Sequence, residues 1–375
     1  MDLLACRKEL DGIDRQIVEL FEKRMEICGN VAQSKIESGK AVYDGEREKQ
    51  KLAAVGEMAH GDFNRTAVQE LFSQMMTISR RYQYRLLAES GRTMELGFQK
   101  VETLPVKGAR IVYQGVEGAY SHAATLQYFG QDADVYHVPT FGEAMEEVQE
   151  GRADYAVLPI ENSSAGAVID NYDLLIEHEN CIVAEIFLPV NHALLARPEA
   201  ELSDIRTVYS HPQALMQSSN YLNSQKDWKQ ISLANTAVAA KKVVEDGDKS
   251  QAAVASEIAG SLYGLKVLKP AIQNNEGNTT RFIVLSRQQV YRADAGKVSI
   301  CFELPHRSGT LYNMLGNFIF NHVNMRMIES RPIPGRNWEY RFFIDIEGNL
   351  DEPGICNALN GIAQEAANLR ILGNY

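Results

Sequence analysis

The stretch from Leu3 to Ser38 restricts the fold more than any other feature of the sequence. It contains no proline, and its apolar residues recur every three or four positions, as in a helix with one buried face. At 1.5 Å per residue, such a helix is about 50 Å long. A helix of this length has few partners in its own chain, so we expect it to pack against a second copy. The recurring apolar residues are Leu10, Ile13, Ile17, Phe21, Cys28 and Val31.

Two further helices are expected before residue 90. One follows Asp44, and the other runs from about Arg65 to Leu87. Turn residues at Ser38-Gly39 and at His60-Gly61-Asp62 separate the three helices. The apolar face of the third helix holds Val68, Leu71, Phe72, Met75 and Tyr82.

Polar residues interrupt the apolar faces of the first and third helices. At about 100° per residue, Arg24 and Lys35 point within a few tens of degrees of Ile17. Ser79 and Gln83 occupy the apolar face of the third helix in the same way. Because a buried charge needs a partner, inward cations imply nearby anions. Two interpretations stay open: a polar pocket for a small dicarboxylate, or internal pairing that only holds the bundle together, with the partners Asp44, Glu46 or Glu48.

The spacing of these polar residues resembles that of the all-helical chorismate mutases, over roughly the first ninety residues. The resemblance implies that chorismate is rearranged to prephenate without a nucleophile or a metal, by holding the substrate and stabilising charge on its ether oxygen. The matching positions are Arg7, Arg24, Lys35, Asp44, Arg47, Glu48, Ser79 and Gln83.

The resemblance also implies a role for each of these positions. Arg7 and Arg24 hold the substrate carboxylates. Lys35 and Gln83 bracket the ether oxygen, and Glu48 binds the ring hydroxyl. In that family two chains intertwine, and the arginine at the Arg7 position reaches the other chain's site. The supporting positions are Asp44, Arg47 and Ser79.

Strands and helices alternate in the middle of the chain. Residues 91–108 lose periodicity and are expected to form a linker with some residual helix. Residues 109–288 predict an α/β region with largely parallel sheets, in one sheet or in two lobes, and the apolar run of residues 182–196 suggests a crossing point between lobes. The expected strands are Arg110–Tyr113, Val135–Val138, Tyr155–Pro159, Thr207–Tyr209, Ile231–Leu233, Ala252–Ala255 and Phe282–Leu285, and the expected helices include one from about Ser121 and one over Phe141–Gln149.

Four polar turns lie at the ends of these strands. They read GVEGAYSH, PIENSSAG, SHPQAL and GNTTRF. Ligands of α/β folds bind beyond the carboxyl ends of strands, where helix N-termini offer free N–H groups, although each of these segments also has the composition of an ordinary turn. The sequence has no glycine motif for nucleotides, no HExxH and no GxSxG.

The four turns resemble those of the prephenate dehydratases, over residues 109–288. The resemblance implies that prephenate loses carbon dioxide and water in one fragmentation without a cofactor, with a proton or hydrogen bond given to the leaving hydroxyl. Thr280 is then the donor, at the mouth of a cleft between lobes, assisted by a protonated Glu161 or by a relayed water. Arg281 is expected near a substrate carboxylate. The remaining pocket residues are Ser121, Asn162, Ser163 and Gln213.

Residues 297–375 follow the order strand, helix, strand, strand, helix, strand of the ferredoxin-like α+β sandwich. They resemble the ACT domain of these dehydratases, which binds phenylalanine between two such domains. Thr310 stands where that family usually has alanine or serine, and Tyr312 follows soon after, so the affinity for phenylalanine stays open. A module that only dimerises is the alternative. The implied allosteric residues are Gly309, Thr310, Leu311, Glu329, Ser330, Arg331 and Pro332.

Composition excludes several classes of partner. The net charge is −11 and there is no basic stripe, so we expect no nucleic acid. No run approaches the roughly 20 apolar residues of a membrane span. The five cysteines are scattered, without a zinc-site spacing, which is typical of reduced thiols in a cytoplasmic protein.

Together the resemblances cover nearly the whole chain and imply a multidomain, bifunctional chorismate mutase/prephenate dehydratase. The expected organisation is a helical domain over 1–90, a linker over 91–108, a two-lobed, periplasmic-binding-protein-like α/β domain over 109–288 and an ACT domain over 297–375. The expected assembly is a homodimer or higher homo-oligomer, with chorismate, prephenate and phenylalanine as ligands and no cofactor or metal. Two alternatives stay open: a solute-binding protein, and a dehydratase whose helical part is an inactive dimeriser.

Overall fold

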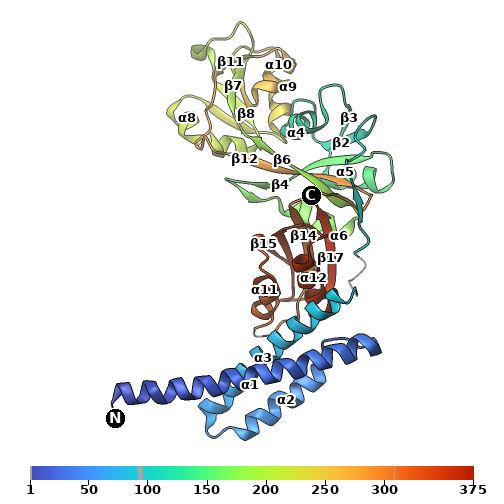
Figure 1. The fold of residues 1–375 in the computed structure, drawn as a ribbon. Coiled ribbons are helices and arrows are strands. Elements are labelled where there is room, and N and C mark those ends of the chain that lie inside the picture. Colours follow the sequence, from blue (N-terminus) through green and yellow to red (C-terminus); the bar gives the residue numbers. More distant parts are fainter. Residues whose placement is uncertain (1, 92–95, 308) are drawn as a thin grey trace. The chain divides into compact units, whose positions relative to one another are not determined.

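The computed structural model describes residues 2–91, 96–307 and 309–375 (Figure 1). The chain divides into two compact units. The first combines Met1–Gly97 with Gly296–Ile371, and the second combines Phe98–Ala295 with Leu372–Tyr375. Within the described residues, no helix is both long and apolar enough to cross a membrane.

Three helices form the N-terminal part of the first unit: α1 (Leu3–Ser38), α2 (Gly45–Met58) and α3 (Asp62–Glu89). The side chain of Asp44 caps α2 by accepting from the backbone N–H of Arg47. Gly39 ends α1 in the left-handed conformation, with φ of 71°, which glycine adopts without strain. Both α1 and α2 pack on α3. The three helices predicted from periodicity are confirmed, including the turns between them.

The C-terminal part of the first unit has the element order β-α-β-β-α-β. Its strands pair in the order β15-β16-β14-β17, so that β15 is an edge strand. Helices α11 and α12 pack on each other and on α3. The elements are β14 (Lys297–Glu303), α11 (Thr310–Phe320), β15 (Met325–Pro332), β16 (Tyr340–Glu347), α12 (Pro353–Glu365) and β17 (Ala367–Asn374).

The second unit contains two principal sheets, one in each lobe (Figure 1). In the first, β2, β3 and β4 are parallel, and β12 runs antiparallel between β4 and β6. In the second, β8, β9 and β10 are parallel, and β7 and β11 are antiparallel. The strands are β2 (Arg110–Gln114), β3 (Asp134–Val138), β4 (Tyr155–Asn162), β6 (Cys181–Pro189), β7 (Ala193–Ala196), β8 (Thr207–Ser210), β9 (Lys229–Ser232), β10 (Gln251–Ala255), β11 (Lys266–Lys269) and β12 (Thr279–Ser286).

Helices follow most of the parallel strands, as expected for α/β lobes. The chain passes from one sheet to the other between β6 and β7, inside the apolar run of residues 182–196, and this confirms the predicted crossing point. It returns between β11 and β12. The helices are α4 (Tyr120–Phe129), α5 (Phe141–Gln149), α6 (Ile169–Glu177), α7 (Pro212–Gln217), α8 (Ser219–Ser224), α9 (Thr236–Asp246) and α10 (Glu257–Tyr263).

Three expectations about this region need correction. The sheets are mixed rather than largely parallel, because the strands that cross between lobes run antiparallel to their neighbours. Strand β12 begins at Thr279, so Thr279, Thr280 and Arg281 belong to this strand and not to a turn before it. The segment 91–108 contains a short strand rather than residual helix: β1 (Gln99–Val101) pairs with β13 (Val290–Arg292) of the second unit. Residues 92–95 lie outside the described part.

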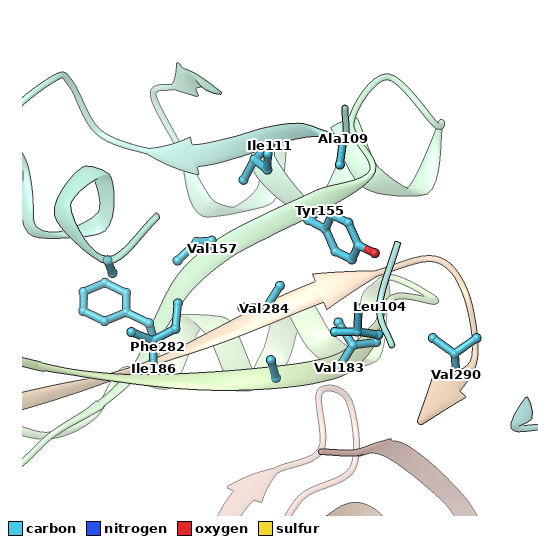
Figure 2. Packing of buried hydrophobic residues seen from close by; sticks show 12 residues of the cluster. Leu104, Ala109, Ile111, Tyr155, Val157, Val183, Ile186, Phe282, Val284 and Val290 are labelled. Atoms are coloured by element: carbon cyan, nitrogen blue, oxygen red, sulfur yellow. The ribbon is translucent and has the colours of Figure 1, made fainter. Parts of the chain in front are cut away.

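A buried apolar cluster supports the first sheet of the second unit. Figure 2 shows Val157 from β4, Ile186 from β6, and Phe282 and Val284 from β12 packed together. Phe282 is fully buried directly after the polar residues of β12. The core therefore fixes where the polar ends of β4 and β12 lie.

The C-terminal residues pair with β6 of the second unit, and glycine is required there. Gly373 opposes Ile182, and a Cβ on Gly373 would lie 2.0 Å from the Ile182 carbonyl oxygen. We expect Gly373→Ala to lower the free energy of unfolding of the second unit by roughly 1–3 kcal/mol, the usual cost of overpacking. Urea unfolding measures the effect. Gly296→Ala is the control, because a Cβ there meets nothing within 4 Å; equal stability of the two variants would contradict the prediction.

Candidate active sites

A cavity of about 360 Å³ lies in the second unit, lined by residues of both lobes. The N-terminal ends of α4 and α9 contribute to its wall, as do the ends of β4 and β12. None of the described residues that line it is Lys or Arg. Its polar lining residues are Gln114, Tyr120, Ser121, Asn162, His192, His211, Gln213, Gln217, Asn235, Thr236 and Thr280.

The pairing of β4 with β12 places Asn162 opposite Thr280 at the cavity wall. Asn162 Nδ2 donates to Thr280 Oγ1 over 2.9 Å. Thr280 is 9% exposed, so its hydroxyl is sheltered but faces the cavity. Four of the residues predicted for this pocket therefore line one cavity: Ser121, Asn162, Gln213 and Thr280.

Glu161 and Arg281 do not line the cavity, because successive strand residues point to opposite faces of a sheet. Arg281 is 7% exposed; its Nε lies 2.8 Å from Glu185 Oε2, and its Nη1 lies 3.7 Å from Glu161 Oε2. It also donates to the Tyr375 hydroxyl. The expectation that Arg281 meets a substrate carboxylate in this cavity therefore needs correction, as does the placing of Glu161 beside Thr280.

Ser163 does not line this cavity either. It is exposed, and its Oγ accepts from the backbone N–H of Thr279 over 2.9 Å. This bond joins the turn after β4 to the start of β12.

In the first unit, Arg24 and Ser79 meet between α1 and α3. Arg24 Nη1 donates to Ser79 Oγ and to the Met75 carbonyl oxygen. Gln83 donates to the Ser79 carbonyl oxygen over 3.2 Å, while its own buried Oε1 has no partner among the described residues. The predicted inward orientation of Arg24, Ser79 and Gln83 is found in the structure.

Lys35 lies at the other end of this polar group. Its Nζ donates to the Val42 carbonyl oxygen over 2.6 Å. Burial lowers the pKa of Lys35 from 10.5, and the carboxylates of Asp44 and Glu48 partly oppose that effect. The net lowering of the pKa shows that the loss of solvation on burial outweighs the attraction of the nearby anions for this ammonium group.

Arg7 and Arg47 stand apart from this group. Both are exposed. Arg7 is seventeen residues before Arg24 on the same helix, which at 1.5 Å per residue separates them by about 25 Å. One chain therefore does not bring all eight predicted positions together.

Glu48 takes part in an ion pair that was not expected from the sequence. Its carboxylate pairs with Arg80 of α3, and Arg80 Nε also lies 3.0 Å from Glu365 Oε1 of α12. The Arg80 side chain is 8% exposed, so this cation is almost fully desolvated between two carboxylates. The pair ties the candidate site on α1–α3 to the C-terminal part of the same unit.

A second hollow, of about 310 Å³, lies at the start of α11. Gly309, Thr310 and Leu311 line it together with Tyr340 and Phe342 of β16. The Thr310 hydroxyl donates back to the carbonyl oxygens of Pro305 and Arg307. The other predicted residues, Glu329 to Pro332, lie on the edge strand β15 and do not line this hollow.

Comparison with known proteins decides the family. The family model for prephenate dehydratase matches residues 111–290, and that for type II chorismate mutase matches residues 6–84. The bifunctional chorismate mutase/prephenate dehydratase of Escherichia coli is 33% identical, over all of this chain and 96% of its own length. That of Pseudomonas aeruginosa is 31% identical, over all of this chain and 97% of its own length.

The chain belongs to the bifunctional chorismate mutase/prephenate dehydratase family. It therefore carries a chorismate mutase and a prephenate dehydratase in one polypeptide.

Solved structures resemble a large part of the chain. A prephenate dehydratase from Arthrobacter aurescens in complex with L-Phe is 31% identical, with a TM-score of 0.67 over 71% of this chain and 89% of its own. A protein described as a novel type of quorum quenching acylase is 34% identical, with a TM-score of 0.66 over 71% of this chain and 97% of its own.

Sequence reasoning missed several residues of the dehydratase and mutase regions. His192 lies in the crossing between lobes, within a largely apolar run, and nothing in that pattern marks it. Gln217 had a signal, because it follows Gln213 by one helical turn in α7 and shares its face. Glu365 is nearly three hundred residues from Arg80 in the sequence, so only the fold could pair them. In the described residues no group of three or more His, Cys, Asp or Glu is arranged to hold a metal.

The Arg80 pair makes a stability prediction for the mutase unit. Arg80→Met leaves the partly buried carboxylates of Glu48 and Glu365 without their cation, which should lower the free energy of unfolding of this unit by about 3 kcal/mol. Urea unfolding followed by far-ultraviolet circular dichroism measures it. Arg85→Met is a matched control on the same helix, because its pair with Glu89 is half exposed and 3.7 Å apart, and should change stability by less than about 0.5 kcal/mol. An Arg80→Met variant as stable as the control would contradict the prediction.

Proposed function

We propose that the cavity of the second unit is the prephenate dehydratase site and that Thr280 acts in it as the hydrogen-bond donor to the leaving hydroxyl. The observation that carries this proposal is the contact of Asn162 Nδ2 with Thr280 Oγ1 at the cavity wall. The amide donates to the threonine oxygen, so the hydroxyl proton is available to a ligand.

The reaction requires little else from the protein. As the C–C bond to the ring carboxylate breaks, carbon dioxide leaves, and the bonding electrons move through the ring and expel the hydroxyl group. A hydrogen bond or proton from the Thr280 side makes the departing group water rather than hydroxide. Because Glu161 points to the other face of the sheet, a relayed water is the better supported source of that proton.

The carboxylates of prephenate need positive potential, and we propose that helix N-termini supply it. Ala119, Tyr120 and Ser121 at the start of α4, and Asn235 and Thr236 at the start of α9, all line the cavity. A helix start offers backbone N–H groups without intrahelical partners and the positive end of the helix dipole. At α9, the Asn235 side chain already accepts from the N–H of Val238. In this proposal the helix starts take the place of Arg281, which was expected near a substrate carboxylate.

We propose that the mutase site is formed by two chains. Arg24, Lys35, Glu48, Ser79 and Gln83 come from one chain, and an Arg7 from a second chain completes the set. Support comes from the distance between Arg7 and Arg24 along α1 and from the exposure of the apolar residues on that helix. The large apolar residues exposed on α1 include Leu10, Ile13, Ile17, Leu20 and Ile27. In this proposal Asp44 and Arg47 hold the start of α2 beside Glu48.

The C-terminal β-α-β-β-α-β part is proposed to be a ferredoxin-like ACT domain that binds phenylalanine and lowers enzyme activity. The order of its elements and strands supports the fold. The hollow at Gly309–Leu311 supports the site, and the edge position of β15 leaves Glu329–Pro332 available to a second copy. The enzyme is proposed to be a cytoplasmic homodimer or higher oligomer, since all five cysteines are free thiols.

Thr280 and Arg24 give the decisive test of the two sites. We expect Thr280→Val to lower kcat for prephenate by roughly 10²- to 10⁴-fold, because the donor is lost. Arg24→Ala should lower mutase kcat/KM by roughly 10²-fold or more, because a charge contact to the substrate is lost. Chromatography of prephenate and phenylpyruvate after addition of chorismate separates the two steps.

Each variant serves as the control for the other. Thr280→Val should convert chorismate at the normal rate and stop at prephenate, and Thr280→Ser should keep most dehydratase activity. Arg24→Ala should still consume supplied prephenate. A Thr280→Val variant that makes phenylpyruvate at the wild-type rate would refute the role of Thr280.

Lys35 predicts the alkaline limit of the mutase. Burial lowers its pKa, so the ammonium group loses its proton at a pH below the 10.5 of a free lysine. Mutase kcat/KM should therefore be full at neutral pH and fall as the pH rises through this lowered pKa. In Lys35→Arg, the side chain stays charged, so this alkaline fall in kcat/KM should disappear even if the variant is slower. An alkaline fall that is unchanged in Lys35→Arg would assign it to another group.

A further inference from the structure

We infer that Tyr120, His192 and Gln217 are positioning residues of the dehydratase, which act through Asn162 to aim the Thr280 hydroxyl proton into the cavity. The inference rests on the proposed role of Thr280 and extends it to residues from three other segments of the chain. The five side chains form one continuous line of hydrogen bonds along the cavity wall.

Backbone groups fix the orientation of the Asn162 amide. Its Oδ1 accepts from the backbone N–H groups of Ser164, at 3.0 Å, and Ala165, at 2.9 Å. A backbone N–H can only donate, so the oxygen of Asn162 must face this turn and its NH₂ group must face β12. Nδ2 then donates to Thr280 Oγ1 and to Asn278 Oδ1, each over 2.9 Å.

This orientation determines what the Thr280 hydroxyl does. Its oxygen accepts the Asn162 proton, so its own proton points elsewhere. Among the described residues no protein acceptor for that proton is found, and Thr280 lines the cavity. If the amide were reversed, Thr280 would donate to Asn162 Oδ1 and its proton would be turned away from a ligand.

The same reasoning continues outward to Gln217 and His192. Gln217 Nε2 lies 3.3 Å from Asn162 Oδ1, which only accepts, so Gln217 must present its NH₂ group there. Its Oε1 therefore faces His192 Nε2, at 3.1 Å, and needs a donor. His192 must carry a proton on Nε2. The two backbone N–H groups at Ser164 and Ala165 thus determine, through Asn162 and Gln217, which ring nitrogen of His192 is protonated.

The far side of the imidazole is held by Tyr120. The Tyr120 hydroxyl lies 3.0 Å from His192 Nδ1 and 2.8 Å from the Asn191 carbonyl oxygen. The backbone N–H of His192 donates to Gln273 Oε1 over 3.0 Å, which fixes the main chain as well. His192 is 2% exposed, and burial lowers its pKa, which favours the neutral ring. With the ring proton on Nε2, His192 Nδ1 and the Asn191 carbonyl oxygen are both acceptors, and they share the single proton of the Tyr120 hydroxyl. From Thr280 to His192 Nε2, each hydrogen bond of the line therefore has a defined donor direction.

The sharpest test is Gln217→Glu. The carboxylate keeps the size of the side chain and still accepts from His192, but it presents an oxygen to Asn162 Oδ1 where the amide presents N–H. We expect dehydratase kcat to fall at least tenfold because the donor is misdirected. KM for prephenate should rise as well, because the new carboxylate lines a cavity that binds a dicarboxylate. Mutase activity of the same chain should be unchanged, which reports that the protein is folded.

A second pair of variants tests the proton on His192. His192→Gln can place an N–H near the position of Nε2 and should restore a substantial part of the rate that His192→Phe loses. The matched control is Gln225→Glu, which adds a negative charge at a partly exposed amide just after α8 that does not line the cavity, and it should behave as wild type. In a Thr280→Ala background, Gln217→Glu should cause no further loss of any residual rate, because the line acts through Thr280.

The possible outcomes separate this inference from the proposed function. Wild-type kcat in Gln217→Glu, or equal rates in His192→Gln and His192→Phe, would overturn the inference while Thr280→Val could still be inactive. A Thr280→Val variant with full activity would overturn the proposed function and this inference together. A loss that appears in KM alone would assign Gln217 to substrate binding and would also overturn the positioning role.

Discussion

The register of β12 between β4 and β6 is the constraint on which the cavity of the second unit, the proposed dehydratase site, depends. It sets Thr280 opposite Asn162 and Arg281 opposite Glu161. Because side chains alternate along a strand, one residue faces the cavity and the next faces away. A slip of one position would exchange a neutral hydroxyl for a buried cation at the cavity wall.

Arg281 shows how the register is held. Its guanidinium group is nearly buried and is satisfied by Glu185 from β6, by Glu161 from β4 and by the Tyr375 hydroxyl. A cation that needs partners on both neighbouring strands allows one register only, since any other would leave a charge unpaired. The apolar residues that follow, beginning with Phe282, anchor the same strand in the core. The positively charged residue of the motif is therefore a structural element of the sheet, while its neighbour Thr280 lines the cavity.

The two units use buried polarity in different ways. The mutase region places cations on helices, where Arg24 is tied to α3 and Arg80 is shared by Glu48 and Glu365. These charges suit a reaction that depends on holding two carboxylates and a polarised ether. The cavity proposed as the dehydratase site has no described Lys or Arg in its wall and is lined by amides, hydroxyls and helix ends. Hydrogen-bond donors with a fixed direction suit a reaction in which one leaving hydroxyl group has to receive a hydrogen bond.

The sequence alone determined the three N-terminal helices, the alternation of strands and helices, the crossing between lobes and most of the polar residues at strand ends, because periodicity and turn chemistry are local. Only the tertiary structure decided which of those residues share a cavity: Thr280 and Asn162 do, whereas Glu161 and Arg281 face away. It alone joined His192 to Gln217 and Arg80 to Glu365. The physical reason is that strand register and the packing of distant helices arise from contacts between segments. The residue pattern of one segment does not identify the segment against which it packs.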